Sequence, residues 1–177
     1  MVQSIKKIAL MMLLFMPILV SAEIMGRYEL EALYVEKISL FTEWPKEKFD
    51  NSTTFKIYIY GSSKIYKPLK KSFGSRKHCG KDVEIIETKN LDLIKKCDIL
   101  IIPDKYRAEL ESYIEVFAKN SILTIAETKR EVKNSAIISL YTNGSGRLRF
   151  SVNSKAIEPS QLKLNYKLLT LAEIVYK

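Results

Sequence analysis

The stretch Ile99-Leu100-Ile101-Ile102 decides the fold of this chain of 177 residues. Four consecutive apolar residues, most of them β-branched, are typical of a strand that is buried on both faces of a parallel sheet. Such a strand lies near the middle of its sheet, with helices packed on both sides. The stretch therefore predicts the centre of an α/β domain.

Strand and helix patterns alternate on both sides of this stretch. Residues 55–60 and 83–86 precede it as predicted strands, and residues 122–126 follow it as a fourth. Between these strands, helices are expected over 65–73 and over 106–119, where apolar residues recur at spacings of three and four. The alternation predicts right-handed crossovers and a largely parallel sheet.

A further helix is predicted over 27–43, before the first strand. Its apolar residues recur at helical spacing, and Pro45 is expected to end it. The stripe that we expect to be buried consists of Leu30, Leu33, Tyr34, Ile38 and Phe41. Four carboxylates on or beside this helix, Glu29, Glu31, Glu36 and Glu43, are expected to form its solvated face.

The alternation of strand and helix patterns ends in the last third of the chain. Only residues 142–146 separate the apolar runs 136–141 and 147–152, which is too short for a crossover, so these runs should form an antiparallel hairpin. Asn165 is the expected N-cap of a last helix. Its predicted buried stripe is Leu168, Leu171, Ala172 and Val175. The expected fold is a single three-layer α/β domain, with a mixed, largely parallel sheet flanked by helices and a C-terminal β-hairpin plus helix.

The first 22 residues have the layout of a signal peptide. Lys6 and Lys7 precede the apolar run 8–20, and the small residue Ala22 follows it. The run is shorter than the roughly 20 residues that span a bilayer. We therefore expect export to the periplasm, cleavage after Ala22 and a mature domain over 23–177. The alternative is an uncleaved N-terminal anchor.

The mature chain is expected to be basic. Removing two lysines from 29 Lys and Arg leaves 27 cations against 20 anions, a net charge of +7. A basic protein often binds nucleic acid, but export makes that partner implausible. Anionic lipid head groups or an acidic protein patch are better candidates, and a solvated basic surface without a partner is the alternative.

Cys79 and Cys97 are the two cysteines of the sequence. Disulfides persist in an oxidising compartment, so these residues are expected to pair. The bridge would close a loop of about 18 residues and stabilise the fold by roughly 3 kcal/mol. The alternative is a pair of buried free thiols.

Residues typical of enzyme active sites are few. His78 is the sole histidine of the sequence, so a Ser-His-Asp or Cys-His site would depend on it alone. A zinc site built from His78, Cys79 and Cys97 lacks a fourth ligand and the usual closely spaced ligand pairs. The six glycines form no phosphate-binding pattern. We therefore expect no catalytic, metal-binding or cofactor-binding residue, and no enzymatic activity.

Three segments together resemble the YfiR family, periplasmic repressors of a membrane-bound diguanylate cyclase. The first is Phe41-Thr42-Glu43-Trp44-Pro45 at the end of the opening helix, and the second is Cys97-Asp98-Ile99-Leu100-Ile101-Ile102. The third is Arg147-Leu148-Arg149-Phe150-Ser151-Val152-Asn153, followed by residues 162–172. In terms of the family, Phe41, Trp44, Pro45, Phe150 and Asn153 are expected to be structural signatures.

The resemblance implies a regulator that works by binding. Such a protein binds the periplasmic part of a diguanylate cyclase and favours its inactive state, and a second partner, an outer-membrane lipoprotein, can sequester it. The resemblance also implies a homodimer. Two other functions stay open from the residues alone: a periplasmic small-molecule-binding protein that serves a sensor kinase or a transporter, and a hydrolase that uses His78.

Overall fold

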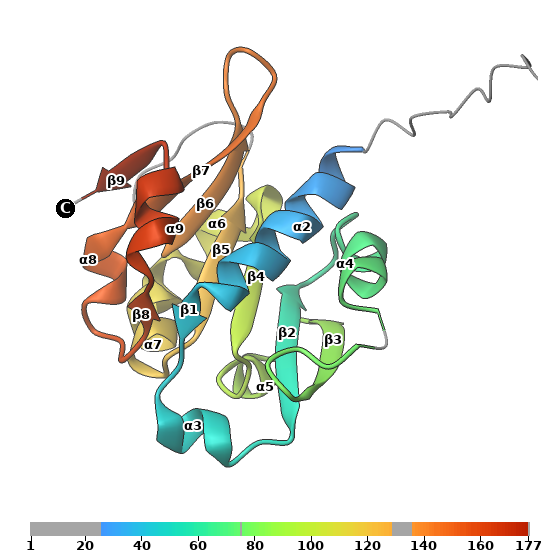
Figure 1. Cartoon of the computed structure of the whole chain (residues 1–177), viewed down its shortest axis with the longest axis vertical. Coiled ribbons are helices and arrows are strands. Elements are labelled where there is room, and N and C mark those ends of the chain that lie inside the picture. The colour runs from blue at the N-terminus through green and yellow to red at the C-terminus, as the bar shows by residue number, and fades with distance from the viewer. Residues whose placement is uncertain (1–25, 75, 129–135, 177) are drawn as a thin grey trace, which may run out of the picture.

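A seven-stranded sheet between two layers of helices forms the body of the protein in the computed structural model, which describes residues 26–74, 76–128 and 136–176 (Figure 1). The sheet is mostly parallel and carries the predicted C-terminal hairpin. The expected single three-layer α/β domain is therefore confirmed. The predicted leader, residues 1–22, lies outside the described residues.

The strands of this sheet follow the order β3-β2-β4-β5-β6-β7-β9. Their bounds are β2 (Thr54–Tyr60), β3 (Asp82–Thr88), β4 (Ile99–Pro103), β5 (Leu123–Glu127), β6 (Ile138–Thr142), β7 (Leu148–Asn153) and β9 (Ile174–Tyr176). Neighbours from β3 to β6 pair in parallel, β7 runs antiparallel to β6, and β9 runs parallel to β7. All residues of β4 and β5 are buried, as expected for strands inside a parallel sheet.

Helices cover both faces of the sheet, and the side chains of each strand alternate between them. One face packs against α2 (Arg27–Leu40), α4 (Tyr66–Phe73) and α9 (Tyr166–Leu171). The other packs against α5 (Leu91–Ile94), α6 (Arg107–Leu110) and α7 (Ile114–Lys119). In β4, Ile99 and Ile101 face the α2 layer, whereas Leu100 and Ile102 face the α7 layer. This alternation is the period of two that a strand imposes.

The first helix ends earlier than predicted, and a different stripe of it is buried. It stops at Leu40, because the chain turns at Phe41 to form β1 (Thr42–Glu43), which pairs with β8 (Lys163–Leu164). Pro45 is instead the N-cap of a new helix, α3 (Lys46–Asp50). The residues that α2 buries are Glu31, Ala32, Val35, Ile38 and Ser39. Of the predicted stripe, only Ile38 is fully buried, and the prediction that Glu31 is solvated is wrong.

Two other helix predictions need correction. The predicted helix over 106–119 is broken into α6 and α7, with 3-10 turns at Asp104–Tyr106 and Glu111–Tyr113. The last helix, α9, ends at Leu171, which is 67% exposed rather than buried. Val175 is not helical but pairs with Val152 as part of β9. A run of Ile, Val and Tyr at positions 174–176 suits a strand better than a helix.

The predictions for the hairpin and for the last N-cap are confirmed. Asn143 closes the hairpin turn, since its side-chain oxygen accepts hydrogen bonds from the amides of Ser145 and Arg147, each at 3.1 Å. Gly146 adopts a φ of 76°, which glycine tolerates without strain. Asn165 caps α9 by accepting a hydrogen bond from the amide of Lys167 at 2.9 Å.

The predicted disulfide is wrong, because both cysteines are free. Cys97 is completely buried among the apolar residues under α5 and α7. Cys79 is exposed in the turn between His78 and Lys81, where its φ is 51°. A thiol enclosed in one core layer cannot reach a thiol on the surface without unfolding.

The two thiols should therefore react at very different rates. Burial raises the pKa of the Cys97 thiol, and the thiolate is the reactive form. We expect the native protein to be alkylated at Cys79, while Cys97 reacts at least about 1000-fold more slowly, through unfolding. Mass spectrometry of timed iodoacetamide quenches measures this. Equal rates, or alkylation of either residue only after reduction, would contradict the structure.

Candidate functional site

A cavity opens at the carboxyl ends of the parallel strands, where the strand order reverses. From β2 the chain passes through α4 to β3, which lies on one side of β2. From β3 it passes through α5, on the opposite face of the sheet, to β4, which lies on the other side of β2. Open α/β sheets bind ligands at this kind of switch point, outside the carboxyl ends of the strands. The cavity measures about 590 Å³, within the usual size range of ligand pockets.

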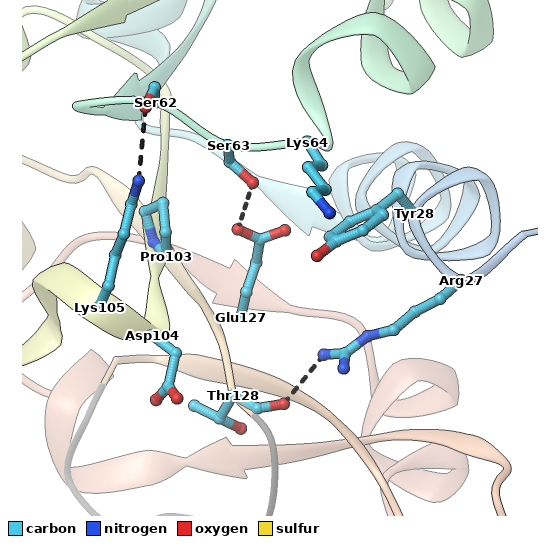
Figure 2. Close-up of a pocket in the computed structure, with 10 residues that line it drawn as sticks. All are labelled: Arg27, Tyr28, Ser62, Ser63, Lys64, Pro103, Asp104, Lys105, Glu127 and Thr128. Atoms are coloured by element: carbon cyan, nitrogen blue, oxygen red, sulfur yellow. Dashed lines mark hydrogen bonds between the residues drawn. The ribbon is translucent and has the colours of Figure 1, made fainter.

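Four segments line the cavity (Figure 2). The first turn of α2 supplies two residues, the loop after β2 three, the end of β4 and the turn after it three, and the end of β5 two. The lining residues are Arg27, Tyr28, Ser62, Ser63, Lys64, Pro103, Asp104, Lys105, Glu127 and Thr128. Three of them are cationic and two carry carboxyl groups, so the cavity is polar and of mixed charge.

The loop after β2 owes its position to a glycine. Gly61 adopts a φ of 68°, and the ring of Tyr106 lies where a β-carbon would be, with its nearest atom 2.4 Å from that point. A larger residue would strain the backbone and displace Tyr106. The turn brings Ser62 and Ser63 over the cavity, where the Ser62 hydroxyl accepts a hydrogen bond from Lys105 at 3.4 Å.

Glu127 is the most unusual residue of the cavity. It is the last residue of β5 and is only 6% exposed. Its Oε2 atom accepts a hydrogen bond from the Ser63 hydroxyl at 2.8 Å, whereas its Oε1 atom is buried without a donor. The pKa of Glu127 is raised to about 7, mainly by burial and also by the nearby Glu31 carboxyl, whereas the Ser63 hydrogen bond and Arg27 act to lower it.

A second buried carboxyl group, Glu31, lies behind the cavity. Its side chain is fully buried, and its Oε1 atom pairs with Arg27 Nε at 2.7 Å. Its Oε2 atom has no hydrogen-bond donor. Arg27 also donates through a terminal nitrogen to the carbonyl oxygen of Thr128 at 3.1 Å, and thereby ties the first turn of α2 to the end of β5 (Figure 2).

The chemistry that this arrangement supports is binding of polar groups or of protons. A buried carboxyl group with a pKa near neutrality can accept a hydrogen bond when ionised and donate one when protonated. Within the described parts of the chain, no group of three or more His, Cys, Asp or Glu side chains is placed to hold a metal ion.

His78, which we considered as a catalytic base, packs in the core instead. The centroid of its ring lies 4.8 Å from that of the Phe55 ring and 5.1 Å from that of the Phe73 ring. Its Nε2 atom is 2.9 Å from the hydroxyl of Ser39, which also donates to the carbonyl oxygen of Glu36. Burial lowers the pKa of His78, which favours the neutral form of the ring. The contact joins the last turn of α2 to the turn before β3.

The segment 41–45 connects the end of α2 with the sheet and with the start of α9. The Trp44 ring stands edge-on to Phe55, with the centroids 5.2 Å apart, and its Nε1 atom donates to the carbonyl oxygen of Asp98 at 3.3 Å. Phe41 accepts a hydrogen bond from the amide of Asn165 through its carbonyl oxygen. Pro45 starts α3, in which Lys48 donates to three backbone carbonyl oxygens, those of Cys97, Asn120 and Ser121.

Phe150 and Asn153 both lie on β7. The Phe150 ring is edge-on to Tyr34 of α2, with the centroids 6.2 Å apart. The Asn153 side chain accepts a hydrogen bond from the amide of Ala156 and caps α8 (Ser154–Ile157). None of the five signature residues, Phe41, Trp44, Pro45, Phe150 and Asn153, is part of the lining of the switch-point cavity.

None of the residues that we singled out from the sequence lines this cavity. Glu127 could have been found, because it directly follows the predicted strand 122–126 and polar residues in that place face the crevice. Glu31 carries no such signal, since a glutamate on a helix is usually solvated. Ser63 lies after the glycine that ends a predicted strand, which is a weak signal.

Comparison with known proteins agrees with the features described above. A family model described as YfiR/HmsC-like matches residues 28–173. The match begins in the first turn of α2 and ends just before β9, so it includes every strand of the seven-stranded sheet except β9. No curated protein matches the chain.

Proposed function

Because this chain belongs to the YfiR/HmsC-like family, we propose that it represses a membrane-bound diguanylate cyclase by binding the periplasmic part of that enzyme. The family points to a periplasmic regulator of cyclic di-GMP signalling, with a regulatory rather than a catalytic role. The family match over residues 28–173 is the observation that carries the proposal.

Repression of this kind needs only a difference in affinity. A protein that binds the inactive arrangement of the cyclase more tightly than the active one shifts the enzyme toward inactivity. A tenfold difference corresponds to about 1.4 kcal/mol, which a few interfacial contacts supply. No bond has to be made or broken by the repressor.

The signal peptide, the mature domain over 23–177 and the periplasmic location belong to the same proposal. No helix in the described part of the chain is both long and apolar enough to cross a bilayer. The proposal also includes a homodimer and sequestration by an outer-membrane lipoprotein. The homodimer and the lipoprotein partner follow from the resemblance to the family, whereas the signal peptide is predicted from the residues at the start of the sequence.

Deletion of the gene should raise cellular cyclic di-GMP several-fold, because the cyclase loses its repressor. The nucleotide is measured by mass spectrometry of cell extracts. The full-length gene, supplied in trans, should restore the low level. A matched gene that lacks codons 2–22 should fail to restore it, since its product stays on the wrong side of the membrane.

Two results would contradict the proposal. The first is an unchanged level of cyclic di-GMP in the deletion strain, provided that this strain expresses the diguanylate cyclase. The second is full restoration by the gene without its leader. An unchanged level would favour the second candidate function, a small-molecule-binding protein that serves a sensor kinase or a transporter. The cavity of about 590 Å³ supports this second function.

A further inference from the structure

Two carboxyl groups from different elements meet at the wall of the switch-point cavity. Arg27 links Glu31 of α2 to the end of β5, because it pairs with Glu31 Oε1 at 2.7 Å and donates to the carbonyl oxygen of Thr128, the residue after Glu127, at 3.1 Å. Each carboxyl group has one satisfied oxygen, through Arg27 and Ser63 respectively. The remaining oxygens, Glu31 Oε2 and Glu127 Oε1, are buried and have no donor in the structure.

A single proton would satisfy both of these oxygens. Buried polar atoms almost always have a hydrogen-bond partner, and a buried unpaired charge is costly. Two carboxylates with one guanidinium beside them, which pairs with Glu31, retain an excess negative charge. When one carboxyl group is protonated, its hydroxyl donates to the other, and the pair with Arg27 becomes neutral overall.

We propose that Glu31 and Glu127 hold one proton between them, and that this pair makes the junction between α2 and β5 sensitive to pH. The proposal concerns the folded domain itself and does not depend on the regulatory function. When the proton leaves, two buried negative charges face each other. The contact between the first turn of α2 and the end of β5, which forms one wall of the cavity, is then weakened.

Other charged and polar groups line the cavity around the pair. From α2, Arg27 pairs with Glu31, and the phenol of Tyr28 lies beside the cavity. From the loop after β2, the Ser63 hydroxyl donates to Glu127, and Lys64 is exposed. From the turn after β4, Lys105 donates to Ser62 and Asp104 pairs with Arg107 at 3.5 Å. Arg27 is the cation for which the structure records a salt bridge to the pair, through Glu31 Oε1.

The sign of the pH dependence follows from the raised pKa of Glu127. An unfolded chain releases this proton near 4.5, the ordinary value, and the folded chain releases it near 7. The stabilising contribution is complete below 4.5 and is lost as the pH rises through about 7. His78 has a lowered pKa and works in the opposite direction, so the effect has to be isolated by comparison with a variant.

The variant Glu127→Gln provides this comparison. Its amide group can donate to Glu31 and accept from Ser63 at every pH, and it therefore mimics the protonated carboxyl group. Urea unfolding of both proteins between about pH 4.5 and about pH 8 gives the equilibrium constant for folding. We expect the ratio of wild type to variant to fall by on the order of 100-fold over this interval.

The exposed residue Glu111 offers a matched control, since Glu111→Gln should keep a constant ratio to the wild type. A constant ratio for Glu127→Gln would overturn the proposal. If that variant does not fold, carbon-13 NMR of the wild-type glutamate carboxyl groups decides the question. A titration of Glu127 near neutral pH that also shifts the carboxyl resonance of Glu31 is expected, and a titration of Glu127 below about pH 5 would overturn the proposal.

Discussion

Replacing Phe55 by Ala should lower the free energy of unfolding by about 4 kcal/mol. Phe55 is completely buried at the start of β2, and its ring contacts three aromatic rings. The centroid distances are 5.2 Å to Trp44, 6.4 Å to Phe49 and 4.8 Å to His78. The variant therefore loses the burial of a large side chain and leaves a cavity where α2, α3 and the sheet meet.

Urea or thermal unfolding followed by circular dichroism measures this loss. Tyr166→Ala is the control for removal of an aromatic ring, because Tyr166 is 76% exposed, and it should change the free energy of unfolding by less than about 0.5 kcal/mol. A loss below about 1 kcal/mol for Phe55→Ala would show that this cluster does not hold the domain together.

Replacing Arg27 by Met should cost about 3 kcal/mol at neutral pH, because it leaves the buried Glu31 without its cation. It also removes the hydrogen bond to Thr128. Methionine retains most of the apolar stem, so the loss reports mainly on the charge. The cost should shrink at acidic pH, where the carboxyl pair can take up protons and lose its negative charge.

A double variant tests whether the loss of stability comes from the unpaired charge of Glu31. Arg27→Met combined with Glu31→Met removes both charges, and it should be more stable than Arg27→Met alone, since no unpaired buried charge remains. Arg147→Met, at an exposed arginine in the hairpin turn, is the matched control and should be nearly neutral. If the double variant is less stable than Arg27→Met, the burial of Glu31 does not depend on Arg27.

The sequence predicts the sheet well because its strands carry local patterns. The apolar run 99–102 and the alternation in 55–60 depend on neighbouring residues alone, and the structure places both in the middle of the domain. The short strands β1 and β8 could not be predicted, since each is two residues long and exists only through pairing with the other. The strand β9 was not predicted, because Val175 also fits the spacing of the last helix and was assigned to it.

The candidate site was harder to predict for a different reason. A lone glutamate such as Glu31 looks like a surface residue until its tertiary partners are known. The disulfide prediction failed in a similar way, because the compartment favours pairing of Cys79 and Cys97 but the fold keeps them apart. Local pattern reports on secondary structure, whereas the contacts of a polar side chain are decided by the topology.

The place of β9 at the end of the chain has a practical consequence. Residues 174–176 pair along β7 and cover this edge of the sheet. An uncovered edge strand invites pairing with other chains. Affinity tags for capture experiments should therefore be separated from β9 by a flexible spacer, and truncated chains that lack these few residues are the ones at risk of aggregation.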